Sequence, residues 1–147
     1  VLNHRPVCPV RRVALIDEAI ELLMNTPEAD ALRSVVLAPQ TPYKMWKIVD
    51  GFMEPLIRLP EFAESFNMPR QLLPKVYWQF GYVDMVRAEV IVSKGKMSGD
   101  RILPFIITDE WVDIDHEDDI QLAERLIGLM QAGKINARPG ATERYSA

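Results

Sequence analysis

Proline is the residue that most restricts how this chain can fold. The 147 residues include 11 prolines, and each one lacks a backbone N–H and disfavours the α conformation of the residue before it. Prolines therefore mark most of the breaks between regular elements along the chain. From Leu59 to Pro74, three prolines lie among Phe62, Phe66 and Met68. This pattern is too irregular for one long helix, so we interpret the segment as an excursion from the folded core.

Two segments carry the pattern of amphipathic helices. Apolar residues recur at helical spacing within 13–24, with acidic residues between them, and residues 25–27 would end that helix. A second apolar stripe runs through 120–130, and the acidic residues 117–119 before it suit the positive end of a helix dipole. We therefore predict one helix in the first part of the chain and one in the last.

Short apolar runs predict the strands of a sheet. They occupy residues 34–38, 82–86 and 103–107. A helix followed by a strand that is buried on both faces favours α/β layering. A separate β-hairpin is predicted where 45–49 and 52–57 flank Asp50-Gly51, because this pair accepts the positive φ angles of a type I′ turn.

The composition excludes several classes of protein. Hydrophobic residues make up 48% of the chain and charged residues 26%, as in an ordinary soluble domain with one core. A formal net charge of −4 argues against a surface that neutralises nucleic-acid phosphates. Cys8 is the only cysteine, which excludes a disulfide framework and a cysteine-based zinc cluster, so a reducing, cytoplasmic location is expected. No signal peptide or membrane span is predicted.

The densest chemical feature is an acidic run between the last predicted strand and the last predicted helix. Asp113 and Asp115 flank Ile114, so on an extended segment both carboxylates would point to one face. Two such carboxylates near the carboxyl end of a strand can hold Mg²⁺, which takes the rest of its shell from water and phosphate oxygens. The alternative is that these acids cap the following helix. His4 and His116 are assigned no role.

Four basic residues lie within two residues of a proline, in predicted loops. They are Arg5, Arg11, Lys44 and Arg70. In a cleft they could hold an anionic substrate, because the arginine guanidinium binds carboxylates and phosphates through two parallel hydrogen bonds. The alternative is that they are scattered surface cations.

These predicted elements and loops contain several segments with recognisable motifs. They are Arg5–Arg11, Ile16–Ile20, Pro42–Lys47, Pro69–Pro74, Gly81–Asp84 and Asp113–Asp119. The first is similar to L-[RQ]-P-T-S-P-L-R, the fourth to P-R-Q-x-x-P and the last to D-I-D-x-x-x-D. In this order they resemble the C-terminal portion of the acylneuraminate cytidylyltransferase family, the enzymes that make CMP-sialic acid and its relatives. The resemblance extends from about Arg5 to about Met130.

The resemblance implies a particular version of the α/β class. It implies a three-layer, Rossmann-like nucleotidyltransferase fold that is incomplete at its N-terminus. Residues 1–136 would be the C-terminal part of the cytidylyltransferase domain, and an excursion at about 43–74 would be the segment through which family members form homodimers. Residues 137–147 would be a polar tail.

The resemblance also implies a reaction and the residues that serve it. Enzymes of this family transfer CMP from CTP to an acidic 2-keto sugar and release pyrophosphate, with Mg²⁺ as cofactor. Arg5, Lys44 and Arg70 match positions that contact the sugar acid, and Asp113 and Asp115 match the carboxylates that hold Mg²⁺. The expected partners are CTP, the sugar acid and a second copy of the chain, without nucleic acid or membrane.

The chain also departs from the family pattern. Val7 and Cys8 replace a Thr-Ser pair, and Phe80 stands where asparagine is usual, so the sugar remains open among sialic acid, Kdo, pseudaminic acid and legionaminic acid. The Gly-rich basic loop that cradles the CTP phosphates in the family is missing, so we expect the chain alone to be inactive. A different class of function stays open, a non-catalytic domain for dimerisation or sugar binding.

Overall fold

The computed structural model describes residues 1–135, and the predicted tail 137–147 lies outside the described residues. The chain divides into two compact units. The first, which we call the sheet unit, combines Val1–Val36 with the chain from Gln79 onward, and the second, the hairpin unit, is Leu37–Trp78. The predicted excursion at 43–74 falls inside the hairpin unit.

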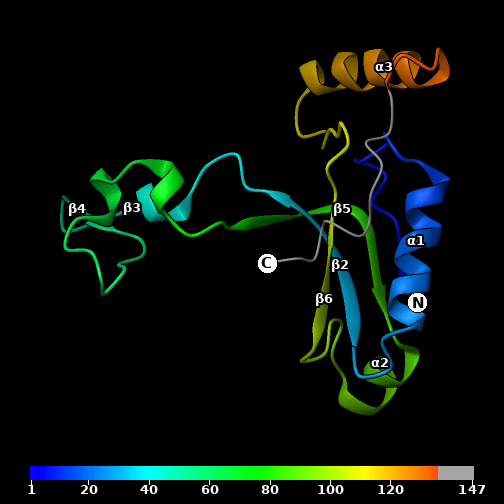
Figure 1. Ribbon diagram of the computed structural model, residues 1–147, viewed down its shortest axis with the longest axis horizontal. Helices are drawn as coiled ribbons and strands as arrows, with labels where there is room; N and C mark the ends of the chain where they lie inside the picture. The colour runs from blue at the N-terminus through cyan, green and yellow to red at the C-terminus, as the bar shows by residue number, and fades with distance from the viewer. Residues whose placement is uncertain (136–147) are drawn as a thin grey trace. The chain divides into compact units, whose positions relative to one another are not determined.

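A four-stranded mixed sheet organises the sheet unit (Figure 1). Its strands, in spatial order, are β1 (Leu2–Asn3), β5 (Tyr77–Val86), β2 (Ala31–Leu37) and β6 (Ile102–Ile106). Strands β2 and β6 run parallel, whereas β1 pairs with β5 antiparallel. The three predicted strands are confirmed, with β5 beginning five residues before its predicted start at Tyr82. The two-residue strand β1 was not predicted, because a pair of residues shows no periodicity.

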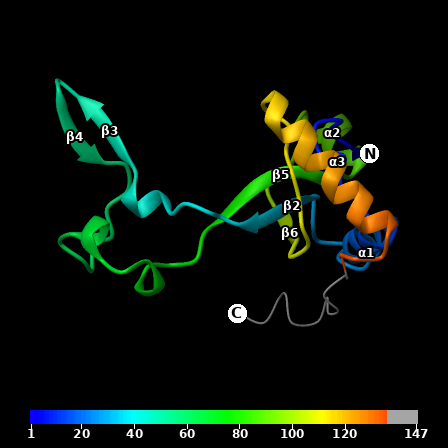
Figure 2. The same cartoon turned by 90° about the horizontal axis from the view of Figure 1, so that it is seen from above.

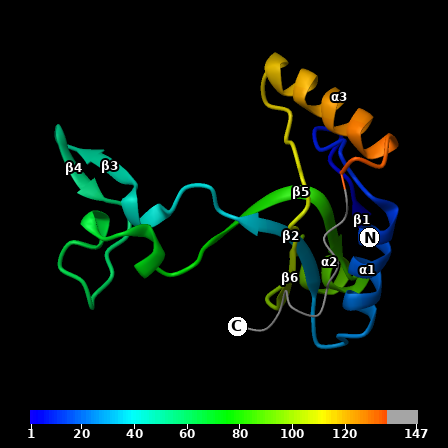
Figure 3. The ribbon, with the colours of Figure 1, turned by 45° about the horizontal axis from the view of Figure 1, so that its top comes forward.

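Within residues 1–135, three helices accompany this sheet (Figures 1 and 3). They are α1 (Val13–Met24), α2 (Ala88–Lys94) and α3 (Glu117–Gln131). The mixed α/β class is therefore confirmed, as are the helices predicted at 13–24 and 120–130. Helix α2 was not predicted, since its seven residues are too few for a clear 3.6-residue pattern. None of the helices in residues 1–135 combines the length and the apolar character needed to cross a membrane.

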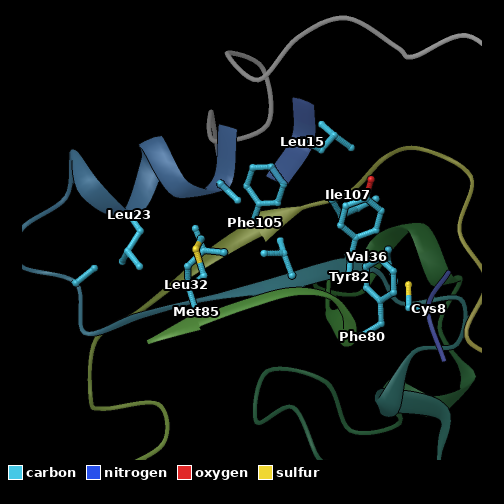
Figure 4. Close-up of a cluster of buried hydrophobic side chains, with 13 residues drawn as sticks. Cys8, Leu15, Leu23, Leu32, Val36, Phe80, Tyr82, Met85, Phe105 and Ile107 are labelled. Atoms are coloured by element: carbon cyan, nitrogen blue, oxygen red, sulfur yellow. The ribbon is translucent and has the colours of Figure 1, made fainter. Parts of the chain in front are cut away.

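The main core lies between α1 and one face of the sheet (Figure 4). Leu15 and Leu23 point from the helix toward Leu32 of β2 and Phe105 of β6, all of them buried. The apolar residues that recur at helical spacing are Val13, Ile16, Ile20, Leu23 and Met24, and of these only Leu23 is buried, with Ile16 packed partly against the core. The helix is confirmed, but its buried face is Leu15, Ala19 and Leu23, while Val13, Ile20 and Met24 are exposed.

Smaller clusters attach the other two helices. Val90 of α2 packs with Ala31 and Val86 as a separate cluster. The buried residues Ala123 and Leu126 of α3 pack with Val10 and Val112. Through this second cluster, the helix that follows the acidic run is joined to the Arg5–Arg11 segment.

The hairpin unit contains the predicted hairpin (Figure 2). Strands β3 (Trp46–Val49) and β4 (Phe52–Pro55) pair antiparallel. Asp50 and Gly51 have φ angles of 50° and 83°, so both central residues of the turn are in the region that a type I′ turn uses. Between β4 and β5 the chain forms only short 3₁₀ turns, at Ser65–Asn67 and Arg70–Leu72. This agrees with the prediction that no long helix occurs in this segment.

Asp30, just before β2, anchors the loop between α2 and β6. The Asp30 carboxylate accepts hydrogen bonds from Lys94 Nζ at 2.7 Å and from the backbone N–H groups of Asp100 at 2.7 Å and Arg101 at 3.1 Å. The Lys94 bond and these two backbone bonds hold the pKa of Asp30 well below its ordinary value. A Cβ at Gly99, whose φ is +71°, would lie 2.3 Å from Asp30 Cβ.

We predict that Gly99→Ala destabilises the sheet unit more than Gly95→Ala. Both glycines have positive φ, which costs alanine about 1 kcal/mol. Only the Gly99 substitution also forces a methyl group onto the anchored Asp30 side chain, at a further cost of about 1–3 kcal/mol. Chemical denaturation of the two variants measures the difference, and equal losses would contradict the proposed clash.

Candidate functional site

The Arg5–Arg11 segment and the acidic run are neighbours in the structure. The backbone N–H of Ile114 donates to the carbonyl oxygen of Val7 at 2.8 Å. The same Arg5–Arg11 segment also reaches β5, through the side chain of Arg11. Two motifs about a hundred residues apart in the sequence are therefore in direct contact within the sheet unit.

Arg11 binds the backbone of β5 instead of pointing into solvent. Its Nε donates to the carbonyl oxygen of Tyr82 at 2.9 Å and its Nη2 donates to that of Gly81 at 2.8 Å. Successive carbonyls of a regular strand point in opposite directions, so two adjacent carbonyls on one guanidinium mark a bulge. The pairing of β1 with β5 ends at Asn3 and Asp84, and Arg11 satisfies carbonyl groups of β5 beyond that point.

Ser34 holds the same irregularity from the neighbouring strand. Its buried hydroxyl donates to the carbonyl oxygen of Phe80 at 2.7 Å and accepts from the backbone N–H of Val83 at 3.0 Å. In a regular strand these two groups, three residues apart, would point to opposite sides. Sequence reasoning missed Ser34, because a single serine in an apolar run carries no motif.

Arg5 is placed by Gly81 and Asp84. A Cβ at Gly81 would lie 2.3 Å from Arg5 Cδ, so the side chain of Arg5 occupies the space that glycine leaves. Arg5 Nη2 lies 3.8 Å from Asp84 Oδ2, and Arg33 Nη1 lies 2.8 Å from the same oxygen. Asp84 is only 2% exposed, and neither of its carboxylate oxygens has an aligned hydrogen-bond donor. The side chain of Arg5 is half-exposed.

Asp113 lies beside the buried thiol of Cys8. Burial raises the pKa of Cys8, Arg11 lowers it in part, and the Asp113 carboxylate raises it further. A thiol that is protonated and fully buried is not a nucleophile. The cysteine at this position is therefore a packing residue.

A magnesium ion at the acidic run would need carboxylate oxygens that have no other partner. Asp113 Oδ1 is buried and has no hydrogen-bond donor. No group of three or more His, Cys, Asp or Glu side chains within residues 1–135 is arranged to hold a metal. Mg²⁺ does not need such a group, since one or two carboxylates suffice when phosphates and water complete its shell. Within residues 1–135 the structure therefore supplies no preformed metal cluster, and Asp113 Oδ1 is the carboxylate oxygen of the acidic run that a magnesium ion would use.

Asp119 has a structural role at the start of α3. Its Oδ2 accepts from the backbone N–H of His116 at 2.8 Å and of Asp115 at 3.0 Å. These two bonds, in that order of importance, lower the pKa of Asp119. The capping alternative for the acidic run therefore holds for Asp119, and His116 is the N-cap residue.

Lys44 and Arg70 belong to the hairpin unit, whereas Arg5, Asp113 and Asp115 belong to the sheet unit. Lys44 is exposed at the end of a 3₁₀ turn, Pro42–Lys44. Arg70 donates from Nη2 to the carbonyl oxygen of Ala38 at 2.6 Å and from Nη1 to that of Pro39 at 2.8 Å.

An ion pair close to the acidic run in the sequence was not predicted. Arg12 pairs with Asp109, and its backbone N–H donates to the hydroxyl of Tyr82 at 2.7 Å. Burial is the main cause that raises the pKa of Tyr82. The three residues are far apart in the sequence, so no local pattern could have revealed this group.

No family model matches the chain, and no curated protein sequence matches it significantly.

We predict that Arg11→Lys lowers the free energy of unfolding by about 2 kcal/mol. A lysine ammonium cannot bind both adjacent carbonyls with the geometry of a guanidinium, so one buried acceptor loses its donor. Arg125→Lys, on the exposed side of α3, is the matched control and should change stability little. Urea denaturation gives both values, and an unchanged stability of Arg11→Lys would show that the guanidinium does not hold the bulge.

Proposed function

We propose that the chain is the sugar-binding and metal-binding part of a cytidylyltransferase that transfers CMP from CTP to an acidic 2-keto sugar. The observation that carries this proposal is the contact between the Arg5–Arg11 segment and the acidic run, through the Ile114 N–H and the Val7 carbonyl. The reaction needs a site for a sugar carboxylate beside a site for a phosphate-bound cation. These two segments bring a half-exposed guanidinium and an unpaired carboxylate oxygen into one unit.

Each residue has a role in this proposal. Arg5 would bind the carboxylate of the sugar. Lys44 and Arg70, in the hairpin unit, are assigned to the sugar acid by the family resemblance alone. Asp113 and Asp115 would hold Mg²⁺, which when bound offsets the negative charge on the reacting phosphate. The anomeric hydroxyl of the sugar would form a bond to the α-phosphorus of CTP, the bond to the β-phosphate oxygen would break, and the hydroxyl proton would be lost as pyrophosphate leaves.

The three-layer, Rossmann-like arrangement is part of the same proposal. Helix α1 packs on one face of the sheet, through Leu15 and Leu23, and Val90 of α2 packs in a cluster of its own with Ala31 and Val86. Ala31 and Leu32 are neighbours on β2 and so point to opposite faces. Helices on both faces of a largely covered sheet are what this class of fold requires.

A non-catalytic domain is the second candidate. Cys8, at the position where the family has a hydroxyl residue, is fully buried in the main core. A sugar hydroxyl could not reach it, so this chain would have lost a polar group from the pocket. Binding or dimerisation without transfer would be compatible with that loss.

We predict that the acidic run binds a divalent cation. Mn²⁺, a paramagnetic substitute for Mg²⁺, should broaden the NMR signals of residues around Asp113 and Asp115. Asp113→Asn should abolish the effect, because it removes a charged oxygen ligand. Asp17→Asn, on the exposed side of α1, should leave it intact. Broadening that does not depend on Asp113 would contradict the metal site.

The same spectra separate the two candidate functions. Added N-acetylneuraminate should shift signals around Arg5 if the sugar pocket exists, and a panel with Kdo, pseudaminic acid and legionaminic acid would identify the preferred sugar. Pyrophosphate release from CTP, Mg²⁺ and that sugar measures transfer directly. Sugar binding without Asp113-dependent metal binding would favour the non-catalytic domain.

The hairpin supports the proposal that the chain forms a homodimer. One face of the hairpin carries Trp46, Ile48 and Met53, and Ile48, directly opposite Met53, is 78% exposed. Phe52, on the other face, is 77% exposed. A two-stranded hairpin with apolar side chains in water on both faces is marginally stable by itself, and such a patch is typical of a protein interface. We propose that a second copy of the chain covers it.

We predict that Ile48→Asp shifts the chain from dimer to monomer, because an aspartate would be buried without a partner in an apolar interface. Val13→Asp introduces the same charge at an exposed apolar position at the start of α1, where an acidic residue is tolerated. Sedimentation velocity over a concentration series should show a dimer for Val13→Asp and a monomer for Ile48→Asp. A monomeric wild type would contradict the proposal.

A further inference from the structure

A cavity of about 390 Å³ lies wholly inside the hairpin unit. Its apolar walls include Leu37, Leu73, Pro74 and Val76. Since all lining residues fall between Leu37 and Val76, the cavity is a property of this unit alone. Its volume is at the lower end of the range found for small-molecule sites.

Hydrogen bonds hold the walls of the cavity together. The Ala38 N–H donates to the carbonyl oxygen of Val76 at 3.0 Å. Arg70, which also lines the cavity, donates to the carbonyl oxygens of Ala38 and Pro39. The backbone N–H of Leu73, a buried residue, donates to the carbonyl oxygen of Arg70 at 3.1 Å. The pocket is thus largely formed before a ligand arrives.

Thr41 leaves a polar group in this wall without a partner. The residue is 7% exposed, and its Oγ1 is buried with no hydrogen-bond partner. A buried hydroxyl without a partner is unfavourable, so native structures rarely keep one without a reason. A rotation about the Cα–Cβ bond, in the presence of a ligand, would let this hydroxyl donate to it.

The charge of the lining selects the ligand. Arg70 and Lys75 line the cavity together with Gln71, and no acidic residue is found among the described residues around it. A guanidinium held by two carbonyls keeps other N–H groups for an anion. The apolar walls favour an organic body over a bare inorganic ion, and the few polar groups suit that body better than they suit a polyhydroxylated sugar.

We propose that this cavity, between Thr41 and Arg70 of the hairpin unit, binds a small carboxylate with an apolar body. Arg70 and Lys75 neutralise the carboxylate, Thr41 donates a hydrogen bond to it, and the apolar walls enclose the rest. Arg70 is also one of the residues that the family resemblance assigns to the sugar acid, so the experiment has to distinguish the two ligands. The proposal does not depend on whether the chain transfers CMP.

Benzoate is the probe for the experiment. Titration of the whole chain, followed by amide NMR signals, should give saturable shifts at Thr41, Gln71 and Lys75 at millimolar benzoate. Lys75→Gln should weaken binding several-fold, because it removes one of two cations at the pocket. Lys47→Gln, an exposed lysine of β3 outside the cavity, should not.

Thr41→Val tests the hydroxyl. It keeps the shape of the side chain and removes an unpaired polar atom, so the variant should be at least as stable as the wild type while binding benzoate several-fold more weakly. Unchanged affinity in this variant would overturn the role of Thr41.

Two comparison ligands complete the test. Inorganic phosphate should bind more weakly than benzoate, and equal binding would reduce the site to a surface cation pair and overturn the proposal. Tighter binding of N-acetylneuraminate than of benzoate at these signals would also overturn it, by reassigning the cavity to the sugar acid. The absence of saturable shifts with benzoate would overturn it while leaving the proposed transferase function untouched.

Discussion

The contact between the Arg11 guanidinium and two adjacent carbonyls of β5 is the interaction on which the candidate site depends. The carbonyl groups of Gly81 and Tyr82 cannot both be served by a neighbouring strand. A buried carbonyl without a donor would be costly, so Arg11 has to stay where it is. Its loop, which also accepts a hydrogen bond from Ile114 at Val7, is thereby fixed between the sheet and the acidic run.

The bulge also decides where Arg5 lies. Ser34 holds the bulge from β2 through Phe80 and Val83, so the backbone around Gly81 is bound on both sides. Only glycine leaves room for the Arg5 side chain there. Ser34, which belongs to no motif, and Arg5, which belongs to a recognisable one, therefore both depend on the backbone conformation around Gly81. A substitution at Ser34 would move a proposed substrate-binding group without touching the substrate.

The elements of this fold were predictable where a local pattern sufficed. The helical spacing in 13–24 and the Asp50-Gly51 turn are properties of neighbouring residues, and both agree with the structure. Helix α2 was not predicted, because its seven residues are too few to show helical periodicity. For the site, Arg11 was picked out as a candidate anion-binding residue, but whether its guanidinium binds a ligand or a carbonyl depends on residues 70 positions away. The Arg12–Asp109 pair was missed for the same reason.

The two units differ in where their charged and apolar side chains lie. The sheet unit buries the Asp84 carboxylate between Arg5 and Arg33 and has an apolar core between α1 and the sheet. The hairpin unit places Ile48 and Phe52 in water and pairs Lys47 with Glu54 only at its surface, where an ion pair contributes little. Burial of apolar surface is the main source of stability. The sheet unit buries apolar side chains in its own core, whereas the hairpin needs another surface to cover its apolar side chains. A second copy of the chain would therefore order the hairpin as well as cover it.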